Sequence, residues 1–238
     1  MTYIITTLAV GDEYINTALS LYYDLLKKTK YADYNITTNI KKNSKENINI
    51  DFFYLDRYHN GEEKTSFYYN LKSLALKYAV NKEYDYIVYL DADYEVTDNF
   101  NEQGLLNLFD YMEKNNYDAI FERPLEIGEN KLAKENILFK KKLEDYNVFD
   151  HNKWDKAHIV NEQFMVFKNS WKYKYFCRRW EEMTWYSIAN SIINFPEGFE
   201  VGVSAIEAEM SFEFSNWRSI LRDYFKFKDK NGNTHYRF

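Results

Sequence analysis

The first half of the chain alternates between two patterns of hydrophobic and polar positions. Short apolar or β-branched runs are typical of buried strands. They occur at Tyr3–Ala9, Tyr34–Ile40, Ile48–Leu55, Tyr86–Leu90 and Asp118–Phe121. Apolar residues at helical spacing are typical of amphipathic helices. They occur from Ile15 to Leu26, from Phe67 to Tyr78 after a candidate cap at Thr65 or Ser66, and from Leu105 to Met112. This alternation predicts an α/β fold, an α/β/α sandwich with a mostly parallel sheet.

The second half is less regular. Residues Leu125–Lys156 are charged and show no period, which favours a long loop or a lid. The predicted elements that follow are a strand at Gln163–Lys168, a helix at Trp171–Asn190, a short helix at Val203–Phe214, and a terminal hairpin of Tyr224–Lys228 and Thr234–Phe238 turning at Asn231-Gly232. The chain has two prolines and no linker-like tract, so we expect one domain over residues 1–238.

The net charge of the chain limits which kinds of molecule it is expected to bind. The 238 residues include 31 Lys and Arg against 37 Asp and Glu, a formal net charge of -6. This argues against a general binder of nucleic acid or of anionic membranes. The single cysteine, Cys177, excludes an internal disulfide framework and a Cys-rich zinc site. No signal peptide is recognisable and no stretch reaches the ~20 apolar residues of a membrane span. We therefore expect a cytoplasmic protein.

Aromatic residues make up 19% of the chain, an unusually large share. They either fill the core or form a surface that stacks on sugars or bases. Most fall at apolar positions of the predicted elements, which favours the core: Phe67, Tyr78, Tyr86, Tyr89, Phe109, Phe164 and Phe167. Two rings are candidates for stacking. Tyr14 lies beside the apolar stripe of the first helix and would contact a base, and Trp154, in the irregular segment, would contact an acceptor sugar.

The most informative motif is Asp91-Ala92-Asp93, which directly follows the apolar strand Tyr86–Leu90. In an open α/β sheet, ligands bind at the carboxyl ends of the strands. Two carboxylates separated by one small residue there would bind a hard cation such as Mg²⁺ or Mn²⁺, together with the oxygens of a nucleotide diphosphate. Alternatively, Asp91 starts a turn that Asp93 caps.

The same motif also fits a phosphatase of the haloacid-dehalogenase type, in which Asp91 would be the nucleophile. That motif requires Thr or Val two residues after the second Asp, where this chain has Glu95. It also normally opens the chain, whereas Asp91 lies well inside it. The phosphatase therefore stays as an alternative.

Three segments together resemble one family. They are the opening strand and turn from Thr7 to Tyr14, the helix Leu71-Lys72-Ser73-Leu74, and Leu90-Asp91-Ala92-Asp93. The chain resembles the nucleotide-sugar glycosyltransferases of GT-A fold, above all the glycogenin-type, family 8 enzymes. The resemblance implies a Rossmann-like fold with a nucleotide-binding half, residues 1–96, and an acceptor-binding half, residues 97–238.

The resemblance also implies roles for individual residues. Uracil would be held by the backbone after Thr7 and Leu8, by Val10 and by the ring of Tyr14. Lys72 would reach the nucleotide sugar, although it lies off the apolar face of its helix, where lysines are usually solvated. The cofactor-binding set is Thr7, Leu8, Val10, Tyr14, Lys72, Asp91 and Ala92. The metal ligands for Mn²⁺ or Mg²⁺ would be Asp91, Asp93 and, from the tail, His235.

Two further positions are candidate catalytic residues by the same resemblance. Asn161 matches an asparagine beside the donor sugar, but Glu162-Gln163 follow it where the family has small residues. Glu207 is the nearest counterpart of an Asp-Gln pair near the reacting carbon. It would steady an oxocarbenium-like charge in a retaining enzyme or act as the general base in an inverting one. The resemblance implies retention. The residue would otherwise lie on a solvated helix face.

We therefore expect a metal-dependent glycosyltransferase of glycan biosynthesis, which moves a sugar from a UDP-sugar donor to a glycan or another hydroxyl acceptor. It would bind neither nucleic acid nor a membrane. The alternatives are the phosphatase or phosphotransferase that uses Asp91, and a non-catalytic domain of glycosyltransferase-like fold that binds glycans or a partner.

Overall fold

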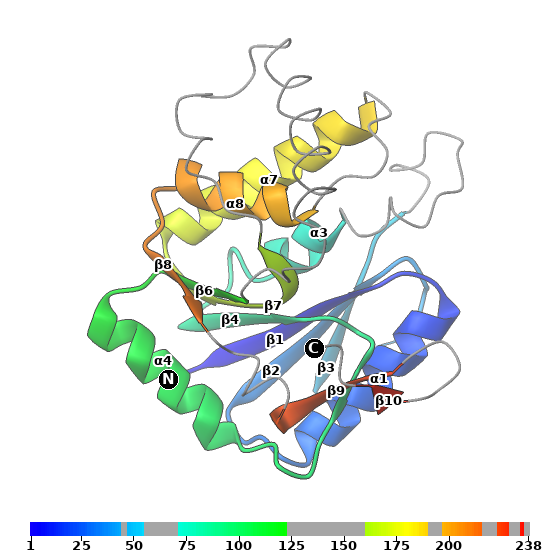
Figure 1. The fold of residues 1–238 in the computed structure, drawn as a ribbon. Helices are drawn as coiled ribbons and strands as arrows, with labels where there is room; N and C mark the ends of the chain where they lie inside the picture. Colours follow the sequence, from blue (N-terminus) through cyan, green and yellow to red (C-terminus); the bar gives the residue numbers. More distant parts are fainter. Residues whose placement is uncertain are drawn as a thin grey trace.

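A sheet of seven strands forms the centre of the molecule, in the order β3-β2-β1-β4-β7-β6-β8 (Figure 1). The computed structural model describes residues 1–43, 47–54, 71–122, 160–189, 197–215, 223–228 and 234–235. The strands are β1 (Tyr3–Ala9), β2 (Ala32–Thr38), β3 (Ile48–Phe52), β4 (Tyr86–Leu90), β6 (Ala119–Glu122), β7 (Asn161–Lys168) and β8 (Phe212–Ser215). Only β7 is antiparallel to its neighbours, β4 and β6, and the other pairs are parallel. The expectation of a mostly parallel sheet is confirmed.

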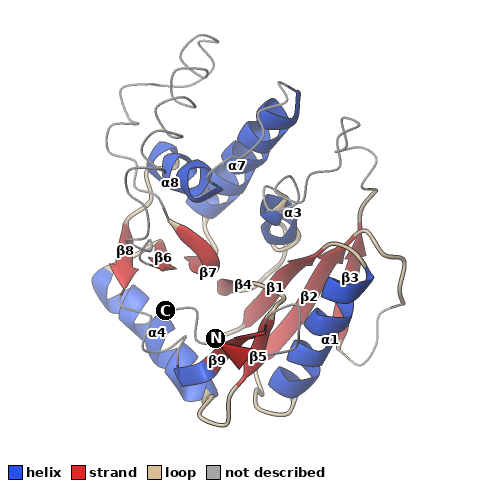
Figure 2. Ribbon diagram, turned by 45° about the vertical axis from the view of Figure 1, so that its right-hand side comes forward, coloured by secondary structure: helices blue, strands red, loops and turns tan. Residues whose placement is uncertain are grey.

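Helices cover both faces of this sheet (Figure 2). One face packs against α1 (Asp12–Leu26) and α4 (Glu102–Asn115), and the other against α3 (Lys72–Lys77), α7 (Trp171–Ala189) and α8 (Glu197–Glu207). Successive strand residues serve opposite faces. Ile5 belongs to the first cluster and Ile4 to the second. The α/β/α sandwich is therefore confirmed, with two apolar cores separated by the sheet.

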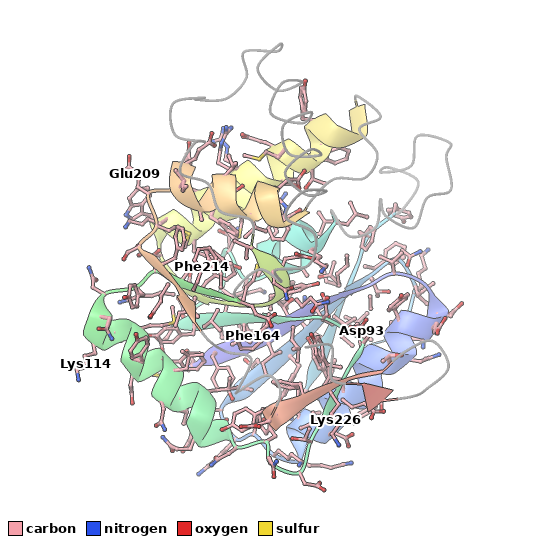
Figure 3. All side chains as sticks on the ribbon, in the orientation of Figure 1. Asp93, Lys114, Phe164, Glu209, Phe214 and Lys226 are labelled. Carbon is pink, nitrogen blue, oxygen red and sulfur yellow. The ribbon has the colours of Figure 1, made fainter. Side chains whose placement is uncertain are left out.

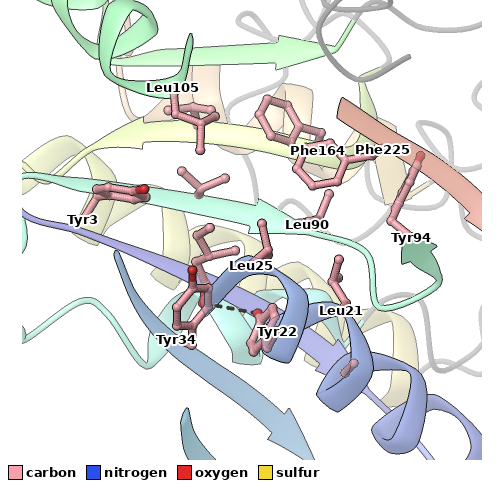
Figure 4. Packing of buried hydrophobic residues seen from close by; sticks show 14 of the residues in the cluster. Tyr3, Leu21, Tyr22, Leu25, Tyr34, Leu90, Tyr94, Leu105, Phe164 and Phe225 are labelled. Atoms are coloured by element: carbon pink, nitrogen blue, oxygen red, sulfur yellow. Dashed lines mark hydrogen bonds between the residues drawn. The ribbon is translucent and has the colours of Figure 1, made fainter. Parts of the chain in front are cut away.

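Aromatic rings fill much of both cores. In the first, the rings of Tyr86 and Phe109 stack with their centroids 4.3 Å apart, and Figure 4 shows the surrounding residues. In the second, Phe167 packs 4.9 Å from Phe176 and 5.6 Å from Phe121. The largest fully buried side chains are all aromatic, so the reading of the aromatic residues as core is confirmed for these rings.

A second, three-stranded sheet brings the tail back to the centre of the chain. Its order is β10-β9-β5, with β5 at Tyr94–Val96, β9 at Phe225–Lys228 and β10 at Thr234–His235. Both pairings are antiparallel, so the two predicted arms of the terminal hairpin do pair. Its turn at Asn231-Gly232 lies outside the described residues. Strand β5 was not expected, and it begins one residue after Asp93.

The predicted short helix at Val203–Phe214 is partly wrong. Helix α8 covers Glu197–Glu207, and Glu209 then adopts a positive φ of 53° that ends the helical path. Strand β8 follows, because Phe212 and Phe214 lie at the spacing of a strand and both pack near the ring of Phe121.

Other expectations also fall outside the described residues. They are the candidate helix cap at Thr65 or Ser66, the start of the predicted helix with the ring of Phe67, the segment Leu125–Lys156, and Trp154 within it. In the described part, none of the helices is both long enough and apolar enough to cross a membrane.

Candidate functional site

The strand order places a natural binding position at the carboxyl ends of β1 and β4. Strand β1 pairs with β2 on one side and with β4 on the other, so the winding of the chain reverses between β1 and β4. Ligands of open α/β sheets bind at such a switch point. The parallel register pairs Thr6 with Tyr89, and continued by two residues it sets Leu8 level with Asp91. The structure thus brings the segment after β1 and the Asp-x-Asp motif to one edge.

Asp91 is the first residue beyond β4 and is held firmly. Its backbone N–H donates to the carbonyl of Gln163, 3.0 Å away, which extends the pairing with β7. Its side chain is 14% exposed. The hydroxyl of Tyr89 donates to Oδ1 at 2.9 Å. Tyr89 lies two residues earlier on the same strand, so both side chains project from one face of the sheet.

Lys72 joins two carboxylates at this edge. It opens α3, its side chain is only 5% exposed, and its Nζ lies 3.0 Å from Oδ1 and 3.2 Å from Oδ2 of Asp91. The same Nζ lies 3.2 Å from Oε1 of Glu162, near the start of β7. We call Lys72, Tyr89, Asp91 and Glu162 the Lys72 cluster. Its one ammonium and two carboxylates sum to a formal charge of -1.

The electrostatics of the Lys72 cluster follow from burial. Loss of water raises the pKa of the Asp91 carboxyl, the ammonium of Lys72 opposes this, and the carboxylate of Glu162 adds to it. Burial, with the charge of Asp91, also raises the pKa of Tyr89 well above its usual value. Tyr89 therefore keeps its proton and acts as a donor to Asp91.

Oxygen donors suit a hard divalent cation at this edge. Asp91 and Asp93 supply carboxylates, the ligands that Mg²⁺ and Mn²⁺ prefer, and Oδ1 of Asp93 is buried. Within the described ranges, however, no group of three or more His, Cys, Asp or Glu side chains is arranged to hold a metal ion. Both oxygens of Asp91 face Lys72. The donor chemistry fits the cation, provided that Lys72 gives up Asp91.

The backbone of His235 lies near the motif through the small sheet. His235 pairs with Phe227, and Phe227 pairs with Tyr94, which follows Asp93. Two strand spacings correspond to about 10 Å between the backbones of His235 and Tyr94. The tail therefore returns to the segment in which the sequence predicts metal ligands.

The other predicted binding residues lie at or near the same edge. Thr7 is buried within β1, whereas Leu8 and Val10 are half-buried. Tyr14, in the first turn of α1, is 37% exposed. Ala92 is buried between the two aspartates. Asn161 begins β7 opposite Glu122, and its Oδ1 accepts from the N–H of Gln163 at 3.3 Å.

Glu207 is not brought to this edge. Helix α8 begins near the start of β7, where the N–H of Val160 donates to the carbonyl of Gly198, and it runs toward the amino end of β8. Glu207 there forms an ion pair with Arg179 of α7, with Nε and Oε2 2.6 Å apart. Figure 3 labels Glu209, just beyond Glu207, at the upper left, well away from Asp93, which lies to the right of the centre.

Sequence reasoning missed two members of the Lys72 cluster and one further buried acid. The signal for Tyr89 was its position two residues before Asp91 on a buried strand. Glu162 stood out only as a departure from the family's small residue. Glu200 of α8 is fully buried and accepts from Nε1 of Trp180 at 2.9 Å, and no local pattern indicated it.

Comparison with known proteins gives little at the level of sequence. No family model and no curated protein matches the chain. Among solved structures, mouse xyloside xylosyltransferase 1 in its apo form is similar, with 10% sequence identity and a TM-score of 0.46. The match covers 91% of this chain and 86% of that one.

Proposed function

We propose that the protein is a metal-dependent glycosyltransferase that moves a sugar from a UDP-sugar to a hydroxyl group of a glycan or similar acceptor. The observation that supports this most is the Lys72 cluster at the carboxyl edge of β1 and β4. It combines a switch point, where nucleotides bind in such sheets, with buried carboxylates suited to a hard cation.

In this proposal each part of the edge has its own role. Leu8, Val10 and Tyr14, at the end of β1 and the start of α1, contact the base. Asp91 and Asp93, with His235 from the tail, hold Mn²⁺ or Mg²⁺. The bound cation neutralises the charge that develops on the departing diphosphate. Lys72 and Asn161 contact the donor sugar and its phosphates. We also propose that the configuration at the transferred sugar carbon is retained, and only the family resemblance supports this part.

A thermal-shift screen with UDP, GDP and CDP, each with and without Mn²⁺, tests the proposal. We expect stabilisation by UDP only when Mn²⁺ is present. At about 100 times the dissociation constant the gain is about 2.7 kcal/mol, a shift of about 5–11 °C for a chain of this size. Asp93→Ala abolishes the shift, because it removes a cation ligand. Asp98→Asn, at a fully exposed carboxylate nearby, keeps it. No response of the wild type to any nucleotide would reject the proposal.

Two further measurements address the alternatives. Release of UDP from UDP-hexoses and UDP-pentoses is expected only from a transferase, and a non-catalytic domain would bind UDP without releasing it from a donor. A phosphatase using Asp91 would instead be stabilised by Mg²⁺ with a fluoride phosphate analogue and would ignore nucleotides.

A further inference from the structure

The ammonium of Lys72 occupies the position at Asp91 that a divalent cation would need. We propose that Lys72 is an internal counter-cation that competes with the divalent cation for Asp91, and that Glu162 is the positioning residue that keeps Lys72 paired once the cation has bound. This inference rests on the proposed function, since it concerns the same cation, and it assigns regulation of cation binding to two residues of this chain.

The geometry of Asp91 supports the competition. Lys72 Nζ lies within 3.2 Å of both carboxylate oxygens, and Tyr89 donates to one of them. Tyr89 is neutral and leaves lone pairs on that oxygen, so it can stay when a cation binds. Lys72 carries the same sign of charge as the cation. Two cations a few ångströms apart in a site largely shielded from water repel each other strongly, so Lys72 must leave Asp91.

Burial explains why Glu162 is needed. The side chain of Lys72 is 5% exposed, and a charge so far removed from water must keep an anionic partner. Glu162 already lies 3.2 Å from Nζ, and its side chain is only 15% exposed. A small rotation of the lysine end therefore transfers the ammonium from Asp91 to Glu162 without exposing either group.

The Lys72 cluster thus has two arrangements of its charged groups. Without the cation, one ammonium serves Asp91 and Glu162 together. With the cation, Asp91 binds the metal and Glu162 keeps its contact with Lys72. A small residue at position 162 would leave Lys72 without this second partner.

The test measures Mn²⁺ binding in the absence of nucleotide, by the electron paramagnetic resonance signal of free Mn²⁺. Lys72→Met removes the competitor with similar shape, and we expect binding at least tenfold tighter than in the wild type. Lys72→Arg keeps the charge and stays within about threefold of the wild type. Glu162→Gln weakens binding about fivefold or more, because the carboxylate that draws Lys72 away from Asp91 is lost. Lys77→Met, on the exposed side of the same helix, is the matched control and changes nothing.

The inference fails if Lys72→Met binds Mn²⁺ no more tightly than the wild type, or if Glu162→Gln binds it equally well. Circular dichroism identifies any variant that has not folded. Glu162→Gln, which nearly preserves shape, decides the question alone if Lys72→Met does not fold. The UDP screen on the wild type tests the proposed function independently of these variants. A metal-dependent UDP shift without the Lys72→Met gain overturns only this inference, and the gain without any UDP shift overturns only the proposed function.

Discussion

Two sets of buried charged side chains pair across long stretches of the sequence. Lys72 reaches Asp91 and Glu162, and Arg179 of α7 reaches Glu207 of α8. The side chain of Glu207 is only 5% exposed. A carboxylate in such a place costs free energy unless its partner compensates it, so the pair fixes how α8 lies on α7.

Glu207→Gln is expected to lower the free energy of unfolding by about 1–3 kcal/mol, since Arg179 loses one partner but keeps Glu182. Urea unfolding measures the change. Glu83→Gln, at an exposed residue outside both helices, is the control and stays within about 0.5 kcal/mol of the wild type.

The same variant examines the catalytic hypothesis for Glu207. If turnover per folded molecule falls by orders of magnitude while stability equals that of the wild type, the ion pair is not the main role of the residue. A loss of stability with turnover retained would count against catalysis by Glu207.

Residues such as Lys72 mark the limit of what sequence can predict at this scale. The helical pattern sets Lys72 off the apolar stripe, at a position that is usually solvated, whereas in the structure Lys72 shares the buried side of α3 with Ala75 and Leu76. The structure buries Lys72, because α3 lies over the end of β4. Its partners Asp91 and Glu162 are 19 and 90 positions away in the chain. The local pattern of hydrophobic and polar positions cannot predict contacts with residues so far away in the sequence.

At the scale of elements, the contact between α4 and the tail shows how the small sheet is anchored. Gly104 of α4 faces the ring of Tyr224, which directly precedes β9. A Cβ atom at position 104 would lie 2.9 Å from Cε2 of that ring, closer than real contacts allow. The carbonyl of Tyr224 accepts from the N–H of Thr97 at 2.8 Å, so its backbone is tied to the end of β5.

Gly104→Ala is therefore expected to destabilise the protein although alanine favours helices. Overpacking costs about 1–3 kcal/mol, more than the gain of about 1 kcal/mol in helix propensity. In a Tyr224→Ala background the clash is gone, and the same substitution should stabilise by about 0.5–1 kcal/mol. Thermal unfolding of the four proteins measures both effects. Stabilisation by Gly104→Ala in both backgrounds would contradict this view of the contact.

Elements with a clear local pattern were predicted well, whereas β5 and β8, which depend on pairing with other strands, were not. Strands β1 and β4 have the bounds that their apolar runs indicate. The sequence pattern predicts a helix over β8, because only the pairing with β6 makes this segment a strand. Strand β5 has three residues and exists through β9, far along the chain, so no local signal marks it.

At the scale of the whole molecule, one sheet joins the two halves that the sequence suggests. Strand β4 belongs to residues 1–96 and β7 to residues 97–238, and they pair along Tyr86–Leu90. Two clusters of apolar side chains also draw on both halves. The mostly parallel α/β architecture was predictable from alternating elements. The reversed direction of β7 was not, because it depends on the path of the chain between β6 and β7.

Because one sheet runs through both halves, we expect the protein to unfold in a single transition, and we expect a bound ligand to raise the melting temperature of both halves together. All five tryptophans lie beyond residue 96, so tryptophan fluorescence reports on the second half, whereas far-UV circular dichroism reports on all helices and strands. The two melting curves should coincide, since the shared sheet makes the halves cooperative. In the proposed function UDP and Mn²⁺ bind at the end of β1 and β4, and they should then raise both midpoints equally. If the fluorescence midpoint stayed in place while the dichroism curve moved or split, the halves would be folding separately, and the sheet across β4 and β7 would be too weak to couple them.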